Sequence, residues 1–270
     1  MKLLSTLAAL AAFTLLPVFG DDAPPKTLMT KPGKLILSED FSKPLPPVEG
    51  STARFASGFH AWRFNVEQRG GHWDVVEGTF RGVENPESKH PATASYGFDF
   101  KNAVIQCEIR MHDVPLNGRT RRAFSVRTTD AKDYVCSIIL DETGMKIQKD
   151  DNDHAGPDRA EPFGFFKSPL KLGEWQTVVF EVYGDEMVGT LNGHSLTGKH
   201  PLITSDKHSI MFVSNGEGAV RNLKIWEAEP NPDWAKNRTM LPAQLPPPPP
   251  APATTAPAAP ATPAAAEPKK

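Results

Sequence analysis

Residues 173–193 read GEWQTVVFEVYGDEMVGTLNG and contain the clearest strand pattern in the chain. Two sets of side chains alternate along its first half: Gln176, Val178, Phe180 and Val182 against Trp175, Thr177, Val179, Glu181 and Tyr183. A period of two places successive side chains on opposite faces of a β-strand. The pairs at 184–185 (Gly-Asp) and 192–193 (Asn-Gly) then mark turns, because Gly and Asn tolerate positive φ. The stretch therefore predicts antiparallel strands joined by tight turns.

Similar patterns continue on both sides of this stretch. Strands are predicted at residues 34–41, 103–111, 123–128, 134–140, 144–148, 175–183, 187–191, 209–213 and 220–226, and a hairpin is predicted at 72–81. Residues 149–168 are rich in Asp, Asn, Gly and Pro, which predicts a long loop. About ten strands with few helices favour an all-β fold of two packed sheets, either a sandwich or a jelly roll.

The start of the chain has the layout of a secretory signal peptide. Lys2 precedes an apolar run from Leu3 to Leu16, and residues 18–20 are small or apolar. The run is too short to span a membrane. We therefore expect residues 1–20 to be a signal peptide, the mature protein to be secreted or periplasmic, and no membrane span to remain in it.

The end of the chain is dominated by proline and alanine. Five consecutive prolines at 246–250 precede a run of Ala, Pro and Thr that ends in two lysines. Proline fixes φ and lacks an amide proton, so we expect an extended polyproline II segment. It is either a spacer or a tether to the cell wall or a proline-binding partner. The predicted organisation is a signal peptide at 1–20, a linker at 21–33, a β-sandwich at 34–234 and a disordered Pro/Ala-rich tail at 235–270.

Composition narrows the class of partner. The net charge is −2 and the isoelectric point is about 6.5, whereas nucleic-acid binders usually carry a basic excess. We therefore expect no nucleic-acid partner. The two cysteines, Cys107 and Cys136, lie in strand-like runs. They form either a disulfide, as exported proteins allow, or two buried thiols.

The order of features in residues 173–193 also resembles a family signature. Gly-x-Trp, a strand, Gly-Asp, a second strand and Asn-Gly are similar to the concanavalin A-like jelly rolls, and most of all to the 3-keto-disaccharide hydrolase-like domains. Residues 35–41, 73–80 and 218–226 resemble other strands of those domains, so the likeness covers residues 34–228. It implies a concanavalin A-like jelly-roll β-sandwich of two antiparallel sheets, with carbohydrate as the partner.

The resemblance implies two activities, glycan binding or hydrolysis of (3-keto-)glycosidic bonds on the concave face. Laminarinase-type glycosidases with this fold carry a Glu-x-Asp-x-x-Glu strand that supplies the nucleophile and the acid. The sequence contains no such triplet. Retaining hydrolysis by that arrangement is therefore not expected.

Candidate catalytic residues come from the strand at 103–111. Its alternation sends Cys107 and its neighbours into the core and leaves four polar side chains on the other face: Gln106, Glu108, Arg110 and His112. In the next strand, Arg127 is predicted to face outward as well. We assign acid–base chemistry to Glu108 or His112, and substrate binding to Gln106, Arg110 and Arg127. The alternative is a solvated face crossed by ion pairs.

Two further groups are candidate sites. Trp175, Glu181 and Tyr183 share one face of their strand and are assigned to substrate binding, because sugar rings stack on aromatic side chains; each aromatic could equally belong to the core. Asp150, Asp151 and Asp153 form either a calcium site or an acidic turn, and calcium is the one cofactor considered.

The competing hypothesis belongs to a different class of protein. The domain would be a non-catalytic surface or adhesion module that the Pro/Ala tail joins to the cell wall or to a partner. An enzyme needs polar groups and an aromatic that converge in a pocket, whereas an adhesion module allows a flat face.

Overall fold

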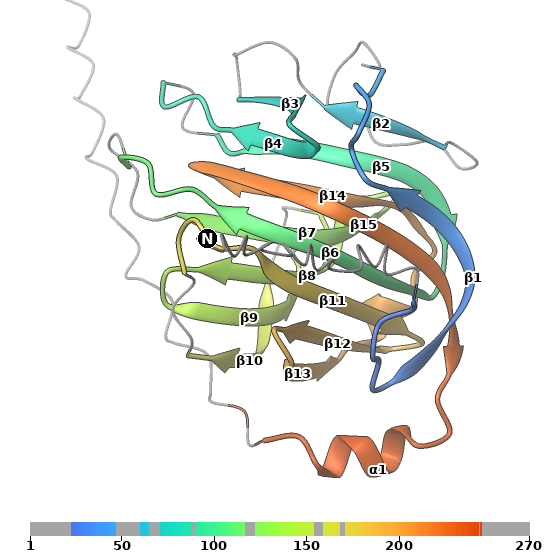
Figure 1. Ribbon diagram of the computed structural model, residues 1–270. Coiled ribbons are helices and arrows are strands. Elements are labelled where there is room, and N and C mark those ends of the chain that lie inside the picture. Colours follow the sequence, from blue (N-terminus) through green and yellow to red (C-terminus); the bar gives the residue numbers. More distant parts are fainter. Residues whose placement is uncertain are drawn as a thin grey trace, which may run out of the picture.

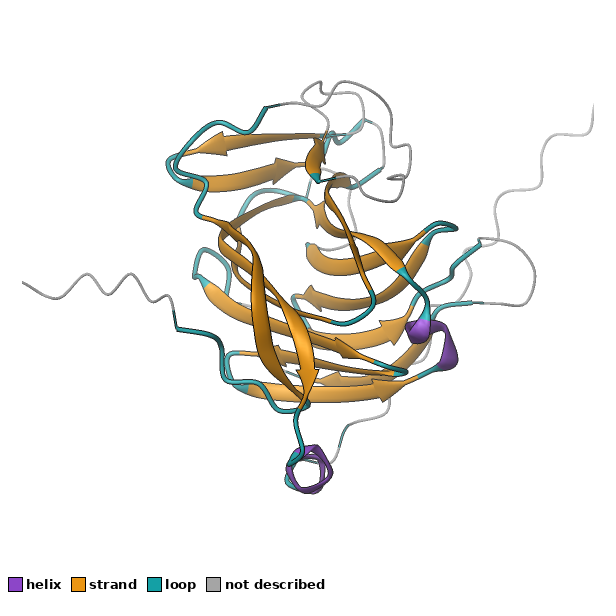
Figure 2. Ribbon diagram, turned by 90° about the vertical axis from the view of Figure 1, so that its right-hand side faces the viewer, coloured by secondary structure: helices purple, strands orange, loops and turns teal. Residues whose placement is uncertain are grey.

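The computed structural model describes residues 23–46, 60–64, 71–87, 90–116, 122–153, 159–167, 171–242 and 244. These residues form two antiparallel sheets packed face to face (Figures 1 and 2). The prediction of an all-β sandwich of two antiparallel sheets is confirmed. The predicted signal peptide and the proline run at 246–250 lie outside the described residues.

Sheet A has eight strands, of which seven follow the order β13-β12-β11-β6-β15-β4-β3 and the eighth, β1, pairs with β15. Their bounds are β1 Thr30–Glu39, β3 His72–Val76, β4 Thr79–Val83, β6 Ala103–Met111, β11 Gln176–Tyr183, β12 Glu186–Leu191, β13 His194–Lys199 and β15 Glu217–Pro230.

Sheet B has seven strands in the order β10-β9-β8-β7-β14-β5-β2. Their bounds are β2 Ala61–Phe64, β5 Ala92–Phe100, β7 Ala123–Asp130, β8 Tyr134–Asp141, β9 Gly144–Lys149, β10 Glu161–Phe166 and β14 Lys207–Asn215. A 3-10 turn, η1 (Pro201–Thr204), precedes β14, and a short helix, α1 (Trp234–Thr239), follows β15. Among the described residues, no helix has the length and apolar character needed to cross a bilayer.

The core lies between the two sheets and follows the predicted alternation. In β6 the residues Ile105, Cys107 and Ile109 are buried, whereas the residues between them are partly exposed. Facing side chains from sheet B, such as Phe124 and Val126, complete the same core. Both cysteines are buried as free thiols, which is the second of the two predicted alternatives.

Two predicted tight turns are present with the expected backbone. Glu77 and Gly78 have φ values of 50° and 70° between β3 and β4, and Asn192 and Gly193 have 47° and 86° between β12 and β13. Positive φ at both central residues matches the twist of the flanking strands. The hairpin predicted at 72–81 is therefore confirmed.

Both ends of the sandwich extend beyond the predicted boundaries of 34 and 234. β1 starts at Thr30 and runs beside the second half of β15 (Figure 1, right-hand edge), inside the segment predicted to be a linker. Residues 27–30, which we call the N-terminal strap, are held on sheet A by hydrogen bonds to Glu181. Helix α1 lies in the segment predicted to be disordered, and its Asn237 amide donates a hydrogen bond to the Leu28 carbonyl at 2.9 Å.

Four strands were not predicted. β10 lies inside the predicted loop 149–168, and β2, β5 and β13 were missed. β10 contains Pro162 and Gly164, which are both unfavourable in strands, and its pairing with β9 is interrupted between these two residues. An edge strand tolerates such residues because one of its sides needs no hydrogen-bonding partner. Proline and glycine therefore made this segment resemble a loop in the sequence.

Candidate functional site

The predicted polar row of β6 is present on the outer face of sheet A. Gln106, Glu108, Arg110 and His112 are all partly exposed and point away from the core. Their side chains share one face because residues two apart in a strand do so. The structure therefore confirms the orientation predicted for these four residues.

Arg127 does not belong to this row, which corrects the predicted patch. It projects from the outer face of β7, in sheet B, whereas Glu108 and Arg110 project from β6, in sheet A. The whole hydrophobic core separates these two faces. Consecutive strands of a sandwich can lie in different sheets, and alternation alone does not reveal which sheet a strand joins.

A compact group surrounds Trp175, just before β11, and we call it the Trp175 patch: Glu108, Arg110, Trp175, Arg221 and Asn222. The guanidinium carbons of Arg110 and Arg221 lie 4.5 and 4.3 Å from the centre of the Trp175 ring. Arg221 is ion-paired with Glu108, and the Asn222 amide donates to the same carboxylate oxygen at 2.9 Å. The Glu108 carboxylate is therefore already engaged by two partners.

His112 lies at the end of the same row, beside Glu217 of β15. Its Nδ1 is 3.6 Å from Glu217 Oε1, which also lies 3.1 Å from Arg81 Nε. The His112 Nε2 atom is buried and has no hydrogen-bond partner. Burial lowers the pKa of His112, and Arg110 and Arg81 act in the same direction, while Glu217 opposes them. A neutral imidazole with one unused nitrogen is the result near pH 7.

The remaining residues assigned to substrate binding on β11 lie elsewhere on sheet A. Glu181 is 0% exposed, and its two oxygens accept hydrogen bonds from the N-terminal strap. Tyr183, at the far end of the strand, is partly exposed beside the turn to β12. Neither residue contacts the Trp175 patch, so Glu181 serves as an anchor for the strap in place of the ligand-binding role predicted for it.

A second polar group lies on the outer face of sheet B, and we call it the Asp150 cluster: Arg127, Tyr134, Ser137, Gln148 and Asp150. Asp150 Oδ1 accepts hydrogen bonds from Gln148 Nε2 at 2.6 Å, Ser137 Oγ at 3.0 Å and an Arg127 nitrogen at 3.4 Å. The Arg127 guanidinium lies 4.9 Å from the centre of the Tyr134 ring. One carboxylate oxygen thus collects donors from three adjacent strands.

The other carboxylate oxygen of Asp150 has no such partner. Asp150 is only 1% exposed, and its Oδ2 atom is buried without any hydrogen bond. Gln148, Ser137 and Arg127 occupy directly paired positions on β9, β8 and β7, so strand register creates the cluster. The sequence showed Gln148 and Asp150 two residues apart, hence on one face, and this signal could have linked them.

The outer face of sheet B around the cluster is unusually shielded. Although Arg127 and Met211 on this face are partly exposed, eight outward-pointing side chains on its strands are at most 8% exposed: Ser95, Ser125, Thr129, Ser137, Ile139, Gln148, Ser209 and Val213. On the outer face of sheet A, the β6 row is partly exposed. The surroundings of Asp150 are therefore more shielded from water than the β6 row is.

The predicted calcium site does not form from the three aspartates. In the described part of the chain, no three His, Cys, Asp or Glu side chains gather as metal ligands. Asp150 instead contacts Arg127 and two neutral donors, which suits a carboxylate that needs no metal. Asp151 and Asp153 follow in the turn after β9.

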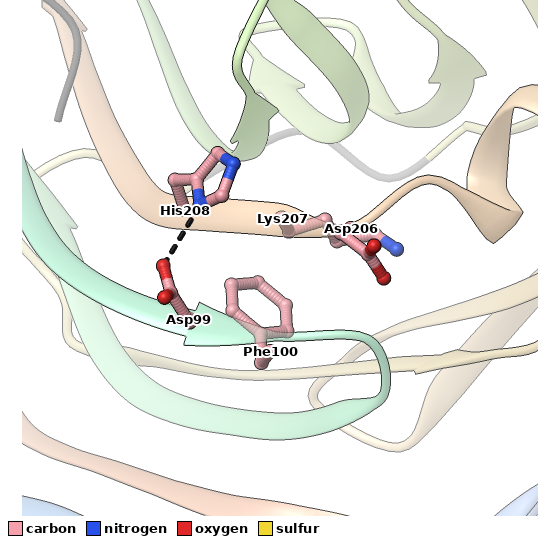
Figure 3. Close-up of a pocket in the computed structure, with 5 residues that line it drawn as sticks. All are labelled: Asp99, Phe100, Asp206, Lys207 and His208. Atoms are coloured by element: carbon pink, nitrogen blue, oxygen red, sulfur yellow. Dashed lines mark hydrogen bonds and ion pairs between the residues drawn. The ribbon is translucent and has the colours of Figure 1, made fainter. Parts of the chain in front are cut away.

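Sequence reasoning did not identify a cavity of about 330 Å³ beside the end of β5 and the start of β14 in sheet B (Figure 3). Its lining residues are Asp99, Phe100, Asp206, Lys207 and His208. His208 Nδ1 lies 2.7 Å from Asp99 Oδ1. The Lys207 ammonium donates to three carbonyl oxygens, those of Lys101, Ile203 and Ser205, at 2.6–3.0 Å. All three ammonium protons are used, so Lys207 stabilises the loop before β14. Its ammonium group is not available to a ligand.

Comparisons with known proteins give distant similarities only. The sequence matches no protein-family model and no curated protein. Among solved structures, the carbohydrate-binding module CBM66 from Bacillus subtilis is 18% identical, with a TM-score of 0.48 over 64% of this chain and 100% of that one. SCLam, a non-specific endo-beta-1,3(4)-glucanase from family GH16, is 11% identical, with a TM-score of 0.49 over 74% of this chain and 95% of that one. Similarities of this size assign neither activity nor ligand.

Proposed function

We propose that the protein is exported and binds a glycan on the outer face of sheet B, with Asp150 as the central hydrogen-bond acceptor. The observation that supports this most is the buried, unpartnered Oδ2 atom of Asp150. Leaving a buried acceptor unsatisfied costs about 1–3 kcal/mol, and such groups in native proteins usually have a functional reason. A sugar hydroxyl donates the missing hydrogen bond.

The chemistry around Asp150 suits a sugar. Sugars carry neighbouring hydroxyl groups that both donate and accept hydrogen bonds, so their sites combine carboxylates with Arg, Gln and Ser side chains. The Asp150 cluster contains these types, and Tyr134 holds the Arg127 guanidinium by cation–π contact. The shielded surroundings strengthen each hydrogen bond, because few water molecules compete there.

Binding fits the Asp150 cluster better than cleavage. Glycosidases use two carboxyl groups about 5–9.5 Å apart across the scissile bond. The Asp150 cluster, as defined above, contains one carboxyl group, and its hydrogen-bond donors are Arg127, Ser137 and Gln148. The single carboxylate is accordingly an acceptor that fixes a ligand hydroxyl.

Hydrolysis of a (3-keto-)glycosidic bond is the second candidate, and His112 is the observation that favours it. Its pKa is lowered by burial, Glu217 lies beside its Nδ1 atom, and its Nε2 atom is unused. A neutral imidazole oriented by a carboxylate can accept a proton from water or a hydroxyl. Glu108 is less suited to this role, because Arg221 and Asn222 already occupy its carboxylate.

The test is calorimetric titration of the full chain, without residues 1–20, against neutral oligosaccharides and 3-keto disaccharides. Product analysis of the same samples separates binding from hydrolysis. We expect heat without new products, and a loss of affinity of about tenfold to a hundredfold in Asp150→Ala, since a hydrogen bond to a charged group contributes about 1.5–3 kcal/mol. Glu108→Gln, on the opposite face, is the matched control and should bind as the parent does.

Three outcomes would overturn the proposal. Unchanged binding in Asp150→Ala would show that the ligand binds elsewhere. Absence of heat with every sugar would show that the protein does not bind these glycans. Product formation that is lost in His112→Gln but kept in Asp150→Ala would favour the second candidate. Circular dichroism of each variant shows whether the fold is retained.

A further inference from the structure

Among the residues that the structure describes, Arg110 is the arginine on the outer face of sheet A for which no ion pair is present. Arg221 is paired with Glu108, and Arg81 with Glu217. In the ranges that the structure describes, no carboxylate lies within ion-pair distance of Arg110, and its Nε atom is buried without a hydrogen bond. A partly buried guanidinium without an anion is costly, because both its charge and its donors are incompletely compensated.

Trp175 fixes the position of this unpaired cation. Its ring lies 4.5 Å from the Arg110 guanidinium carbon, a distance typical of cation–π contact. A stacked guanidinium keeps its N–H edge free, and that edge matches the two oxygens of a carboxylate or sulfate. The contact therefore prepares Arg110 for a planar, two-point interaction.

His112 adds a second unused polar atom on the same face. It lies two residues from Arg110 in the chain, about 6–7 Å along one face of the strand. Its Nε2 atom is buried and unpartnered, as is the Arg110 Nε atom. On the neighbouring strand β15, the residue paired with Arg110 is Ala219, whose short side chain carries no polar group that could bind the guanidinium.

The neighbouring carboxylates do not repel an incoming anion. Glu108 is neutralised by Arg221, and Glu217 lies between Arg81 and His112. Within the described residues, the excess positive charge of this group is thus concentrated on Arg110. An anion that approaches Arg110 beside Trp175 meets the Glu108 carboxylate only as the partner of Arg221, whereas the Asp74 carboxylate lies across β4, in register with Arg81.

We propose that the outer face of sheet A is a second binding site, which takes the oxyanion group of an acidic saccharide, either a carboxylate or a sulfate. Arg110 is the anchor for the oxyanion, Trp175 holds the guanidinium in place, and the unpartnered Nε2 atom of the neutral His112 accepts a hydrogen bond from a hydroxyl group of the same saccharide. This site lies on the face opposite the Asp150 cluster and does not depend on the glycan proposed there. A chain with two such faces can connect an acidic saccharide to a second glycan.

The indole N–H resonance of Trp175 in the full chain without residues 1–20 reports on this site, and its absence from the spectrum of Trp175→Phe identifies it. The probes are trigalacturonate, a sulfated chondroitin tetrasaccharide and neutral maltotriose, at constant ionic strength. We expect saturable shifts with one or both acidic probes and none with maltotriose. Arg110→Gln should weaken binding at least about tenfold, the effect of losing a charge-assisted hydrogen bond.

Controls distinguish this site from general charge attraction and from the site on sheet B. Lys171→Gln removes one positive charge from an exposed residue that is paired with Glu174, and it should leave the titration unchanged. Arg110→Lys keeps the charge but loses the planar fork, so its affinity should fall between those of the parent and Arg110→Gln. Asp150→Ala should bind the acidic probes as the parent does.

Three results would overturn the proposal. These are no saturable shift with either acidic probe, equal shifts with maltotriose, or unchanged binding in Arg110→Gln. Loss of acidic-probe binding in Asp150→Ala would show that the Asp150 cluster and the Trp175 patch are not independent sites. Saturation by trigalacturonate alone, by the sulfated probe alone or by both supports the site and identifies the oxyanion it accepts.

Discussion

The Glu181 carboxylate and the backbone amide of Thr30 are joined by a 2.7 Å hydrogen bond across 151 residues of sequence. The amides of Leu28 and Met29 donate to the same carboxylate, as does the Thr30 hydroxyl. Glu181 is 0% exposed, so the strap covers its carboxylate on the outer face of sheet A and shields it from water. The N-terminal strap is consequently part of the folded domain.

Glu181→Gln should destabilise the domain by about 2 kcal/mol, because the amide nitrogen of Gln would face an N–H donor of the strap. The measurement is the free energy of unfolding in urea, with Tyr183→Phe on the same strand face as the control. A chain that starts at Lys34 should lose stability as well, since Glu181 is then left buried and unsatisfied. Equal stability of the chains starting at 21 and at 34 would contradict this role.

His112 should titrate with a pKa below its usual value of 6.5, because burial disfavours the imidazolium. The unfolded chain then binds the proton more tightly, so stability should rise with pH through the region below 6.5 and level off above it. Proton NMR of the imidazole checks the pKa. Glu217→Gln should lower it further, and Arg81→Gln should raise it. A pKa above 6.5 would show that Glu217 dominates burial.

Alternation in the sequence was sufficient to predict which faces of β6 and β7 meet the core. It separated Cys107 from Glu108, and Val126 from Arg127, because the period of two depends only on local backbone geometry. The turn at 77–78 was equally predictable, since positive φ restricts the residues that fit. These features depend on neighbours in the sequence.

The partition between sheets and the role of Glu181 could not be predicted in that way. Glu108 and Arg127 both read as outward residues, yet the core separates them, because strand pairing is decided by contacts between distant segments. Glu181 has the same parity as Thr177 and Val179, but the strap covers it. The Asp150 cluster likewise depends on the register of three strands, which short patterns do not specify.

Lys207→Met should be among the most destabilising single changes, at about 3–5 kcal/mol, because three carbonyl groups would lose their donor in a buried site. His208→Gln, the next residue and a partly exposed one, is the control and should have little effect. Thermal unfolding of both variants gives the comparison. A Lys207→Met protein as stable as the parent would show that the loop before β14 has other means of closure.

Cys107 and Cys136 should react slowly with thiol reagents in the native protein. Burial raises the pKa of each thiol to about 12, and the thiolate is the reactive form. Ellman's reagent should detect no thiol in the folded protein and both thiols after unfolding without reductant. Detection of none after unfolding would reveal a disulfide and contradict the presence of two free thiols.

Gly82 and Trp73 occupy directly paired positions on β4 and β3, and the indole covers the glycine. A Cβ atom at position 82 would lie 2.5 Å from two ring carbons of Trp73, which is 1% exposed and held by core aromatics such as Phe80. Gly82→Ala should therefore destabilise the domain by about 1–3 kcal/mol, the usual cost of overpacking.

A double-mutant cycle with Trp73→Phe tests the cause of that loss. The smaller ring leaves room for the methyl group, so Gly82→Ala should cost less in the Trp73→Phe background than in the parent. Urea unfolding of the four proteins gives the coupling energy. Strictly additive losses would mean that close packing against Trp73 does not determine the cost.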